Sequence, residues 1–318
     1  MILNILLLLL SLAMLYFGAE GLVRGSSSLA IRAKVSPLVV GLTIVAFGTS
    51  SPELVVSLNA TLAGQGDISI GNVVGSNIFN ICVILGLAAI IQPMNVRKQL
   101  TQIDVPIMIG VAALFTVMFW HGHLSRLAGA VLFIGIIAYT VFSIVYAKKE
   151  SKKNPESIEE FDSFKASKSV WLDVLYIAIG LVILIIASNL LVKSSVFIAK
   201  AMGVSEAVIG LTIIAAGTSM PELATSIVAA IRKNPEIAIG NVVGSNIFNI
   251  LSILGISSLV KPITAPNVNY IDLLIMLSVS VLLLIMMRYK YKISRVDGAF
   301  SFIIYIGYTF FLLRNIAA

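Results

Sequence analysis

The feature that most constrains this chain is a long apolar segment that occurs twice. Residues 36–93 align with residues 205–262 without a gap, at an offset of 169, and 32 of the 58 aligned positions are identical. Each copy places one glutamate, Glu53 or Glu222, inside an apolar run. A charged side chain at such a depth costs roughly 2.5–3.5 kcal/mol on insertion scales, so it indicates a function. We therefore expect two related halves that share one cation site at the middle of a membrane.

The composition supports a polytopic membrane protein. Of the 318 residues, 58% are hydrophobic and only 12% are charged, whereas a soluble domain has about 25% charged residues. The apolar runs have the length that crosses a hydrocarbon core of ~30 Å as a helix. We expect an all-α fold with ten transmembrane helices, at residues 2–22, 36–62, 68–91, 104–120, 125–147, 171–191, 205–231, 237–260, 270–288 and 297–314. The helix of the first span is expected to continue as an amphipathic segment to about Ile31.

The number of spans in each half predicts how the halves are related. A hydrophilic connection, residues 148–170, separates a first repeat (1–147) from a second repeat (171–318), each with five spans. Because five is odd, the second half enters the bilayer from the opposite side, as in inverted repeats. Of the 22 lysines and arginines, 17 lie on the side of the central connection. The positive-inside rule then predicts that this connection is cytoplasmic and that both termini lie outside.

The net charge of +7 and the single cysteine exclude several other classes. The basic residues lie between spans and form no soluble patch, so we expect no nucleic-acid partner. Cys82, as the only cysteine, permits neither an intrachain disulfide nor a cysteine metal cluster. We expect the lipid bilayer as the environment, no cofactor and no obligatory protein partner.

A proline next to each glutamate predicts a break in the helix. Pro52 has no N–H group, so the carbonyl of Gly48 loses its helical partner, and the residue before Pro52 is pushed away from helical geometry. We expect the helix to open over residues 46–51 and, by the repeat, over 215–220. Unpaired carbonyls occur at membrane depth only where they face protein, water or an ion. A hard cation such as Ca²⁺ takes 6–8 oxygen ligands, and such carbonyls suit it.

The two glutamates together predict exchange. The two-fold axis of an inverted repeat would bring Glu53 and Glu222 face to face, where two carboxylates repel unless a cation or a proton lies between them. One divalent ion or two monovalent ions would cancel both charges. Either set of ions neutralises the site, whereas the site without any ion is unfavourable. A site with these properties exchanges one ion for the other.

Neutral oxygens are expected from the third span of each half. A serine and an asparagine four residues apart share a helix face there. We expect these pairs to contact the ion, namely Ser76 with Asn80 and Ser245 with Asn249. For four further asparagines, ion contact and hydrogen bonding between helices remain alternatives: Asn72, Asn77, Asn241 and Asn246.

Both copies carry motifs of a known family. The first half has GTSSPE (48–53) and GNVVGSNIFNI (71–81), and the second has GTSMPE (217–222) and GNVVGSNIFNI (240–250). These resemble the two α-repeats of the cation/calcium exchanger superfamily, in its prokaryotic sodium/calcium exchanger type, and the resemblance covers all ten spans. It implies secondary active exchange of Na⁺ for Ca²⁺ across the cell membrane by alternating access, with the first and sixth spans sliding against the rest.

The resemblance also implies roles for particular residues. It assigns Ca²⁺ to Glu53 and Glu222 with the carbonyls of Thr49 and Thr218, and Na⁺ to sites that add Ser50, Ser219, Ser76, Ser245 and the carbonyls of Ala46 and Ala215, with Asn80 as a further polar residue. One position departs from a pattern in the family. Potassium-dependent members rely on an acid at the position of Asn249, so the asparagine here argues against potassium co-transport.

Other functions are compatible with parts of this pattern. The same two glutamates could each take a proton, which gives an H⁺/Ca²⁺ antiporter, and other divalent cations are alternative substrates. Two intramembrane acids could form a protease dyad, but known intramembrane dyads use aspartates, so we expect no enzyme. A channel is a further alternative that strictly coupled counter-transport would exclude.

Overall fold

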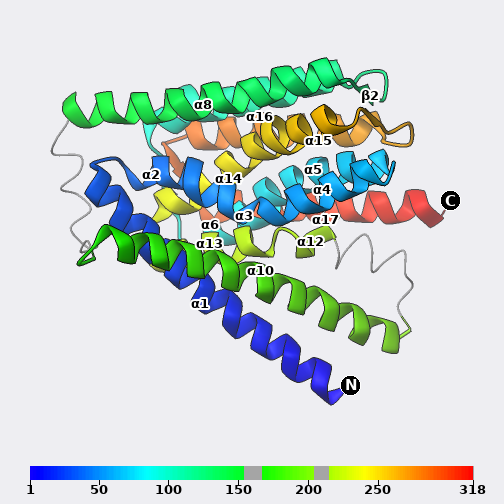
Figure 1. Ribbon diagram of the computed structural model, residues 1–318, viewed down its shortest axis with the longest axis horizontal. Helices are drawn as coiled ribbons and strands as arrows, with labels where there is room; N and C mark the ends of the chain where they lie inside the picture. The colour runs from blue at the N-terminus through cyan, green and yellow to red at the C-terminus, as the bar shows by residue number, and fades with distance from the viewer. Residues whose placement is uncertain (154–166, 204–214, 318) are drawn as a thin grey trace.

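The computed structural model describes residues 1–153, 167–203 and 215–317, which form a bundle of long helices (Figure 1). The first half contains α1 (Ile2–Ala33), α2 (Pro37–Val40), α3 (Ala46–Thr49), α4 (Ser51–Leu62), α5 (Gly66–Phe79), α6 (Gly86–Ile91), α7 (Val105–Met118) and α8 (Arg126–Lys153). The second half contains α10 (Val170–Ala201), α12 (Ala215–Gly217), α13 (Met220–Ile231), α14 (Pro235–Phe248), α15 (Gly255–Val260), α16 (Tyr270–Arg288) and α17 (Arg295–Ala317).

Short π-helical turns and strands complete the described elements. The π-helical turns are η1 (Gly41–Val45), η2 (Asn80–Leu85), η3 (Leu100–Asp104) and η5 (Asn249–Leu254). The strands are β1 (Met94–Asn95), β2 (His123–Leu124), β3 (Ile263–Thr264) and β4 (Lys292–Ile293).

The helices agree with an integral membrane protein of many spans. Among the described residues, eight helical segments are long and apolar enough to cross a membrane. The expected second span is a bent pair, Pro37–Thr49 and Ser51–Leu62, with an angle of 45° between its parts. In the expected seventh span, α13 is shorter than a membrane crossing, and residues 204–214 lie outside the described part of the chain.

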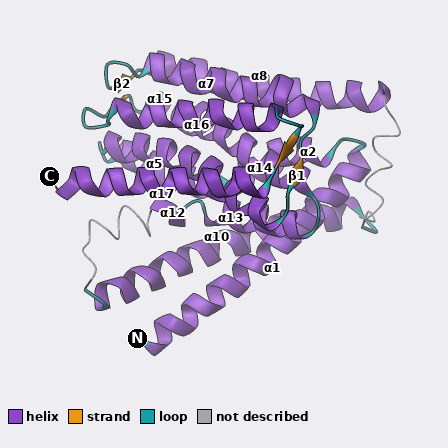
Figure 2. Ribbon diagram, turned by 180° about the vertical axis from the view of Figure 1, so that it is seen from behind, coloured by secondary structure: helices purple, strands orange, loops and turns teal. Residues whose placement is uncertain are grey.

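Two helices extend beyond their expected ends. α1 continues to Ala33, two residues past the end expected for its amphipathic segment, and α10 continues to Ala201 rather than ending near residue 191. These two helices lie side by side along one edge of the bundle (Figures 1 and 2). A Cβ atom at Gly180 would lie 2.7 Å from the carbonyl oxygen of Gly18, so the backbones touch. Close packing of small residues stabilises helix pairs in membranes, and it supports the helical ends that hydropathy alone did not predict.

The two halves pair reciprocally at their strands. β1 pairs with β4 in antiparallel fashion, and β2 pairs with β3. At the repeat offset of 169, β1 corresponds to β3 and β2 to β4. Each half therefore contributes one strand to each pair, and the same contact is made twice with the roles of the halves exchanged.

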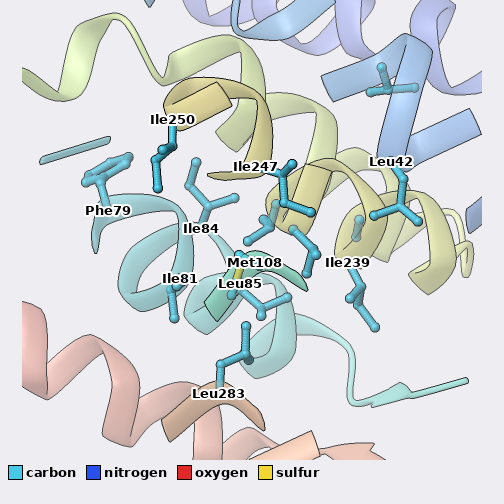
Figure 3. Close-up of a cluster of buried hydrophobic side chains, with 14 of the residues drawn as sticks. Leu42, Phe79, Ile81, Ile84, Leu85, Met108, Ile239, Ile247, Ile250 and Leu283 are labelled. Atoms are coloured by element: carbon cyan, nitrogen blue, oxygen red, sulfur yellow. The ribbon is translucent and has the colours of Figure 1, made fainter. Parts of the chain in front are cut away.

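The core of the bundle is centred on α14. Ile239 and Ile247 of this helix pack with Ile84 and Leu85 of η2 and with Met108 of α7 (Figure 3). Of the most apolar window of residues 235–260, 94% is buried inside the protein. Helices at the periphery face the bilayer, whereas α14 is surrounded by protein. The polar site is assembled against this central helix.

Candidate functional site

The glutamates follow breaks in both halves. Between α3 and α4, Ser50 has φ −80° and ψ 5°, and α4 then begins at Ser51. Before α13, Ser219 has φ −87° and ψ 10°. Glu53 and Glu222 lie in the first turn of the helices that follow. The N-terminal end of each helix, where backbone N–H groups have no helical partner, is therefore close to a carboxylate.

The break is narrower than the sequence suggested. Residues 46–49 remain helical, and the backbone N–H of Ser50 donates to the carbonyl oxygen of Ala46 at 3.0 Å. The expectation of an open segment over 46–51 is therefore wrong at its beginning. The physical reason is that Pro52 removes a single donor, and the N–H groups before it still find their helical partners.

Each carboxylate is held by the other half of the chain. The hydroxyl of Ser50 donates to Oε1 of Glu222 at 2.9 Å, and the hydroxyl of Ser219 donates to Oε1 of Glu53 at 2.9 Å. Ser219 also contacts the hydroxyl of Ser76 at 3.2 Å. Both glutamates are 1% exposed, and they are close enough to interact electrostatically. The crossed serines therefore bring the two carboxylates into one buried cluster.

Several oxygens in this region have no protein donor. Among the described residues, the buried atoms without a hydrogen-bond partner include Oε2 of Glu53, Oε2 of Glu222, Oδ1 of Asn80, Oδ1 of Asn249 and Oγ of Ser245. Buried polar atoms are ordinarily paired, and each exception needs an explanation. These are oxygens on side chains predicted to contact an ion, and a hard cation is bound by such oxygens.

Four asparagines join the third span of one half to that of the other. Nδ2 of Asn80 donates to Oδ1 of Asn246 at 3.0 Å, and Nδ2 of Asn249 donates to Oδ1 of Asn77 at 3.0 Å. Asn77 and Asn246 each donate to the other's carbonyl oxygen at 3.3 Å. Because the amide N–H groups are used in this way, the oxygens of Asn80 and Asn249 are left free for another ligand.

The π-helical turns explain how these asparagines are placed. Asn80 is the first residue of η2, and Asn249 is the first residue of η5. A π-helical turn changes the direction of the following side chains, and such turns are frequent at functional sites. The sequence did not predict them, since nothing in helical periodicity distinguishes a π-helical turn.

A second pair of asparagines supports the broken helices. Asn72 donates to the hydroxyl of Ser57 at 2.9 Å and to the carbonyl of Glu53 at 3.3 Å. Asn241 makes the equivalent bonds to Ser226 at 3.1 Å and to the carbonyl of Glu222 at 3.3 Å. Sequence reasoning missed both serines, although the repeat offset relates them and could have identified them.

We use the name central cluster for the residues, other than the two alanines, that the sequence predicted as ion ligands. It consists of Thr49, Ser50, Glu53, Ser76 and Asn80 in the first half and of Thr218, Ser219, Glu222, Ser245 and Asn249 in the second. Thr49 donates to Oδ1 of Asn241 at 3.0 Å, and Thr218 donates to Oδ1 of Asn72 at 3.5 Å, which links both threonines to the supporting asparagines.

Two predicted carbonyl ligands and one further acid lie outside this set. The carbonyl of Ala46 already accepts the bond from Ser50, and Ala215 is the first residue of α12. Glu20 pairs with Arg232 at 2.6 Å, with the two side chains 29% and 48% exposed. Glu20 is therefore a partly exposed ion-pair residue outside the central cluster.

Comparison with known proteins identifies the family. The family model described as sodium/calcium exchanger protein matches residues 3–145 and 172–314. The chain belongs to this family. It is a member of the cation/calcium exchanger superfamily in its prokaryotic type, and the family consists of transporters rather than enzymes.

Relatives match along nearly the whole chain. The sodium/calcium exchanger MaX1 of Methanosarcina acetivorans is 33% identical over an alignment of 339 positions, which covers 96% of this chain and 97% of the relative. The inner membrane protein YrbG of Escherichia coli is 34% identical over 285 residues, 89% of this chain and 88% of the relative. A structure of the sodium-calcium exchanger NCX_Mj, soaked with Na⁺ and Ca²⁺, superposes with a TM-score of 0.83 at 34% identity and covers 96% of this chain and 97% of that one.

Proposed function

We propose that this protein is a secondary active antiporter that exchanges Na⁺ for Ca²⁺ across the cell membrane by alternating access, with the ions bound between Glu53 and Glu222. The observation that carries the proposal is the pair of buried carboxylate oxygens, one on each glutamate, that lack a described donor. The exchangers MaX1 and NCX_Mj, which match almost the full chain, support the same substrates.

The proposal includes ten spans arranged as two inverted repeats, residues 1–147 and 171–318, with the α-repeat motifs at 36–93 and 205–262. The reciprocal bonds between serines and glutamates and the reciprocal strand pairs support a two-fold relation between the halves. Both marked chain ends lie at one end of the bundle, while the end of α8 and the start of α10 lie at the other (Figure 1). This arrangement, with the lysine and arginine bias, supports outside termini and a cytoplasmic connection 148–170.

Charge determines which ions the central cluster accepts. Two carboxylates carry a formal charge of −2, which one Ca²⁺ or two Na⁺ would cancel. The hydroxyls of Ser50 and Ser219 now donate to the carboxylates, but a hydroxyl has acceptor lone pairs as well. When a cation binds, each hydroxyl can rotate to offer its oxygen, so the same side chains serve the empty and the filled site. The carbonyls of Thr49 and Thr218 are assigned as further Ca²⁺ ligands.

The neutral oxygens favour sodium over protons as the coupling ion. A proton needs only a carboxylate, whereas Na⁺ needs a coordination shell. Ser245, Asn80 and Asn249 each offer a buried oxygen with no described hydrogen-bond partner. In an antiporter driven by protons these oxygens would serve only the Ca²⁺-bound state, whereas Na⁺ would use them in the return step as well.

A flux experiment separates the two coupling ions. Purified protein is reconstituted into liposomes loaded with Na⁺ and diluted into Na⁺-free buffer containing ⁴⁵Ca²⁺. We expect Ca²⁺ uptake that requires internal Na⁺ and persists with a proton ionophore. Uptake that follows only an imposed pH gradient would contradict sodium coupling.

Asn249 determines, in this proposal, that potassium is not co-transported. Asn249→Asp adds a third buried carboxylate and removes the donor to Asn77, so the site must bind additional positive charge. We expect Ca²⁺ uptake by this variant to become dependent on K⁺ or to change its Na⁺ dependence. The measurement is the same flux assay with K⁺ varied at fixed Na⁺, and identical ion dependence in both proteins would remove Asn249 from the site.

A further inference from the structure

A groove on the flank of the bundle is separate from the ion-binding cluster. Its volume is about 510 Å³, and its walls come from α8 on one side, the first part of the broken span (α2, η1 and α3) on another, and α1 and α10 on the third. On α8 the lining residues are Ile136, Thr140, Ile144 and Lys148. They are spaced four apart, so they form a single face of that helix.

The groove has the dimensions and the lining of an acyl-chain site. From Ile136 to Lys148 the helix rises about 18 Å, which is close to half of a ~30 Å hydrocarbon core. Apart from Lys148 and two threonines, the lining side chains are apolar. Ile44, Phe47 and Ile144 are 39%, 55% and 40% exposed, and in a membrane these surfaces face lipid. A lipid chain therefore has both access to the groove and an apolar surface to bury against.

The charge at one end of the groove selects a headgroup. Lys148 is exposed and has no hydrogen-bond or ion-pair partner within the described ranges. Lys34, also exposed, lies between two lining residues, Ala33 and Val35. Lysines at the membrane surface attract anionic lipids. We propose that this groove binds one anionic phospholipid from the leaflet at the C-terminal end of α8, with its phosphate on Lys148 and one acyl chain along α8.

The inner end of the groove touches residues next to the central cluster. Phe47 packs edge-on against Phe248, with 5.0 Å between ring centroids, and both rings line the groove. Phe248 directly precedes Asn249, and a Cβ atom at Gly48 would lie 2.6 Å from the side chain of Leu181, another lining residue. A bound acyl chain would therefore contact side chains that are one or two residues from the predicted ion ligands.

Native mass spectrometry of the purified protein tests the proposal without any transport measurement. The protein is mixed with phosphatidylglycerol and phosphatidylcholine of the same acyl chains, and the lipid retained on each chain is measured. The wild-type protein should retain one phosphatidylglycerol in preference to phosphatidylcholine. Lys148→Gln should reduce that preference about fivefold, and Lys292→Gln, an exposed lysine in β4 outside the groove, serves as the matched control and should not.

A second variant tests the position of the acyl chain. Thr140→Trp fills the middle of the groove and should reduce the retention of both lipids at least about tenfold, while the elution volume and melting temperature stay those of the wild type. The proposal is overturned if wild-type protein retains both lipids equally, if Lys148→Gln behaves as Lys292→Gln does, or if Thr140→Trp retains lipid as before. If neither the wild type nor any variant exchanged Na⁺ for Ca²⁺, but the wild type still retained phosphatidylglycerol selectively, the proposed function would be contradicted and the lipid site would not.

Discussion

Glu53→Gln and Glu222→Gln should each abolish Ca²⁺ uptake while the protein still inserts in the membrane. Glutamine keeps the volume of the side chain and an oxygen that can accept the crossed serine bond, but it removes one of the two charges that neutralise Ca²⁺. Removing one partner of a buried charge pair costs about 3–5 kcal/mol, which corresponds to more than 100-fold in affinity. The measurement is Na⁺-driven ⁴⁵Ca²⁺ uptake in liposomes, normalised to the amount of reconstituted protein.

Glu20→Gln is the matched control for these variants. Glu20 is also an acid on an apolar helix, but its partner is Arg232 and both side chains are partly exposed. Surface ion pairs contribute only about 0–1 kcal/mol, so Glu20→Gln should keep most of the uptake. Normal coupled exchange by either Glu53→Gln or Glu222→Gln would refute the assignment of the site.

Gly244→Val should separate the broken span from the third span of the other half and stop transport. A Cβ atom at Gly244 would lie 2.6 Å from the carbonyl oxygen of Leu42 and 2.8 Å from Cβ of Ala46. Backbone this close has no room to yield, and valine adds two further methyl groups. Overpacking of this kind costs typically about 1–3 kcal/mol. The displaced backbone is next to Ser245, one of the predicted ion ligands.

Two measurements check this expectation. The melting temperature of the purified variant should fall, and Ca²⁺ uptake should decrease at least about tenfold. Gly307→Val is the control, because nothing lies within 4 Å of a Cβ atom at Gly307 among the described residues. Equal Ca²⁺ uptake and equal melting temperatures for Gly244→Val and Gly307→Val would contradict this expectation. The site would then not depend on the close approach of these helices.

The parts of the structure that the sequence predicted are those encoded locally or by the repeat. Pro52 and Pro221 predicted the breaks from the chemistry of a missing donor, and the spacing of Ser76 and Asn80 predicted a shared face. The duplication predicted that Glu53 and Glu222 would meet. In the structure, Ser219 joins Glu53 to Ser76, Ser50 binds Glu222, and Asn80 binds Asn246, while the break leaves Ala46 helical.

The parts that the sequence did not predict depend on contacts between segments far apart in the chain. Ser50 binds Glu222 rather than the nearer Glu53, and no local pattern encodes that crossing. The length of α10 depends on its packing against α1 through Gly18 and Gly180, whereas hydropathy measures only transfer to lipid. The ion pair of Glu20 with Arg232 is likewise a tertiary contact.

The central claim is that one cluster holds either Ca²⁺ or Na⁺ between the two glutamates. The most direct measurement is equilibrium binding of ⁴⁵Ca²⁺ to purified protein in detergent, with increasing Na⁺, for the wild type and for the double variant Glu53→Gln/Glu222→Gln. The account predicts one Ca²⁺ per chain, displaced by Na⁺ with a Hill coefficient above one, and no binding by the double variant. Ca²⁺ binding that Na⁺ does not displace, or that survives the loss of both carboxylates, would contradict it.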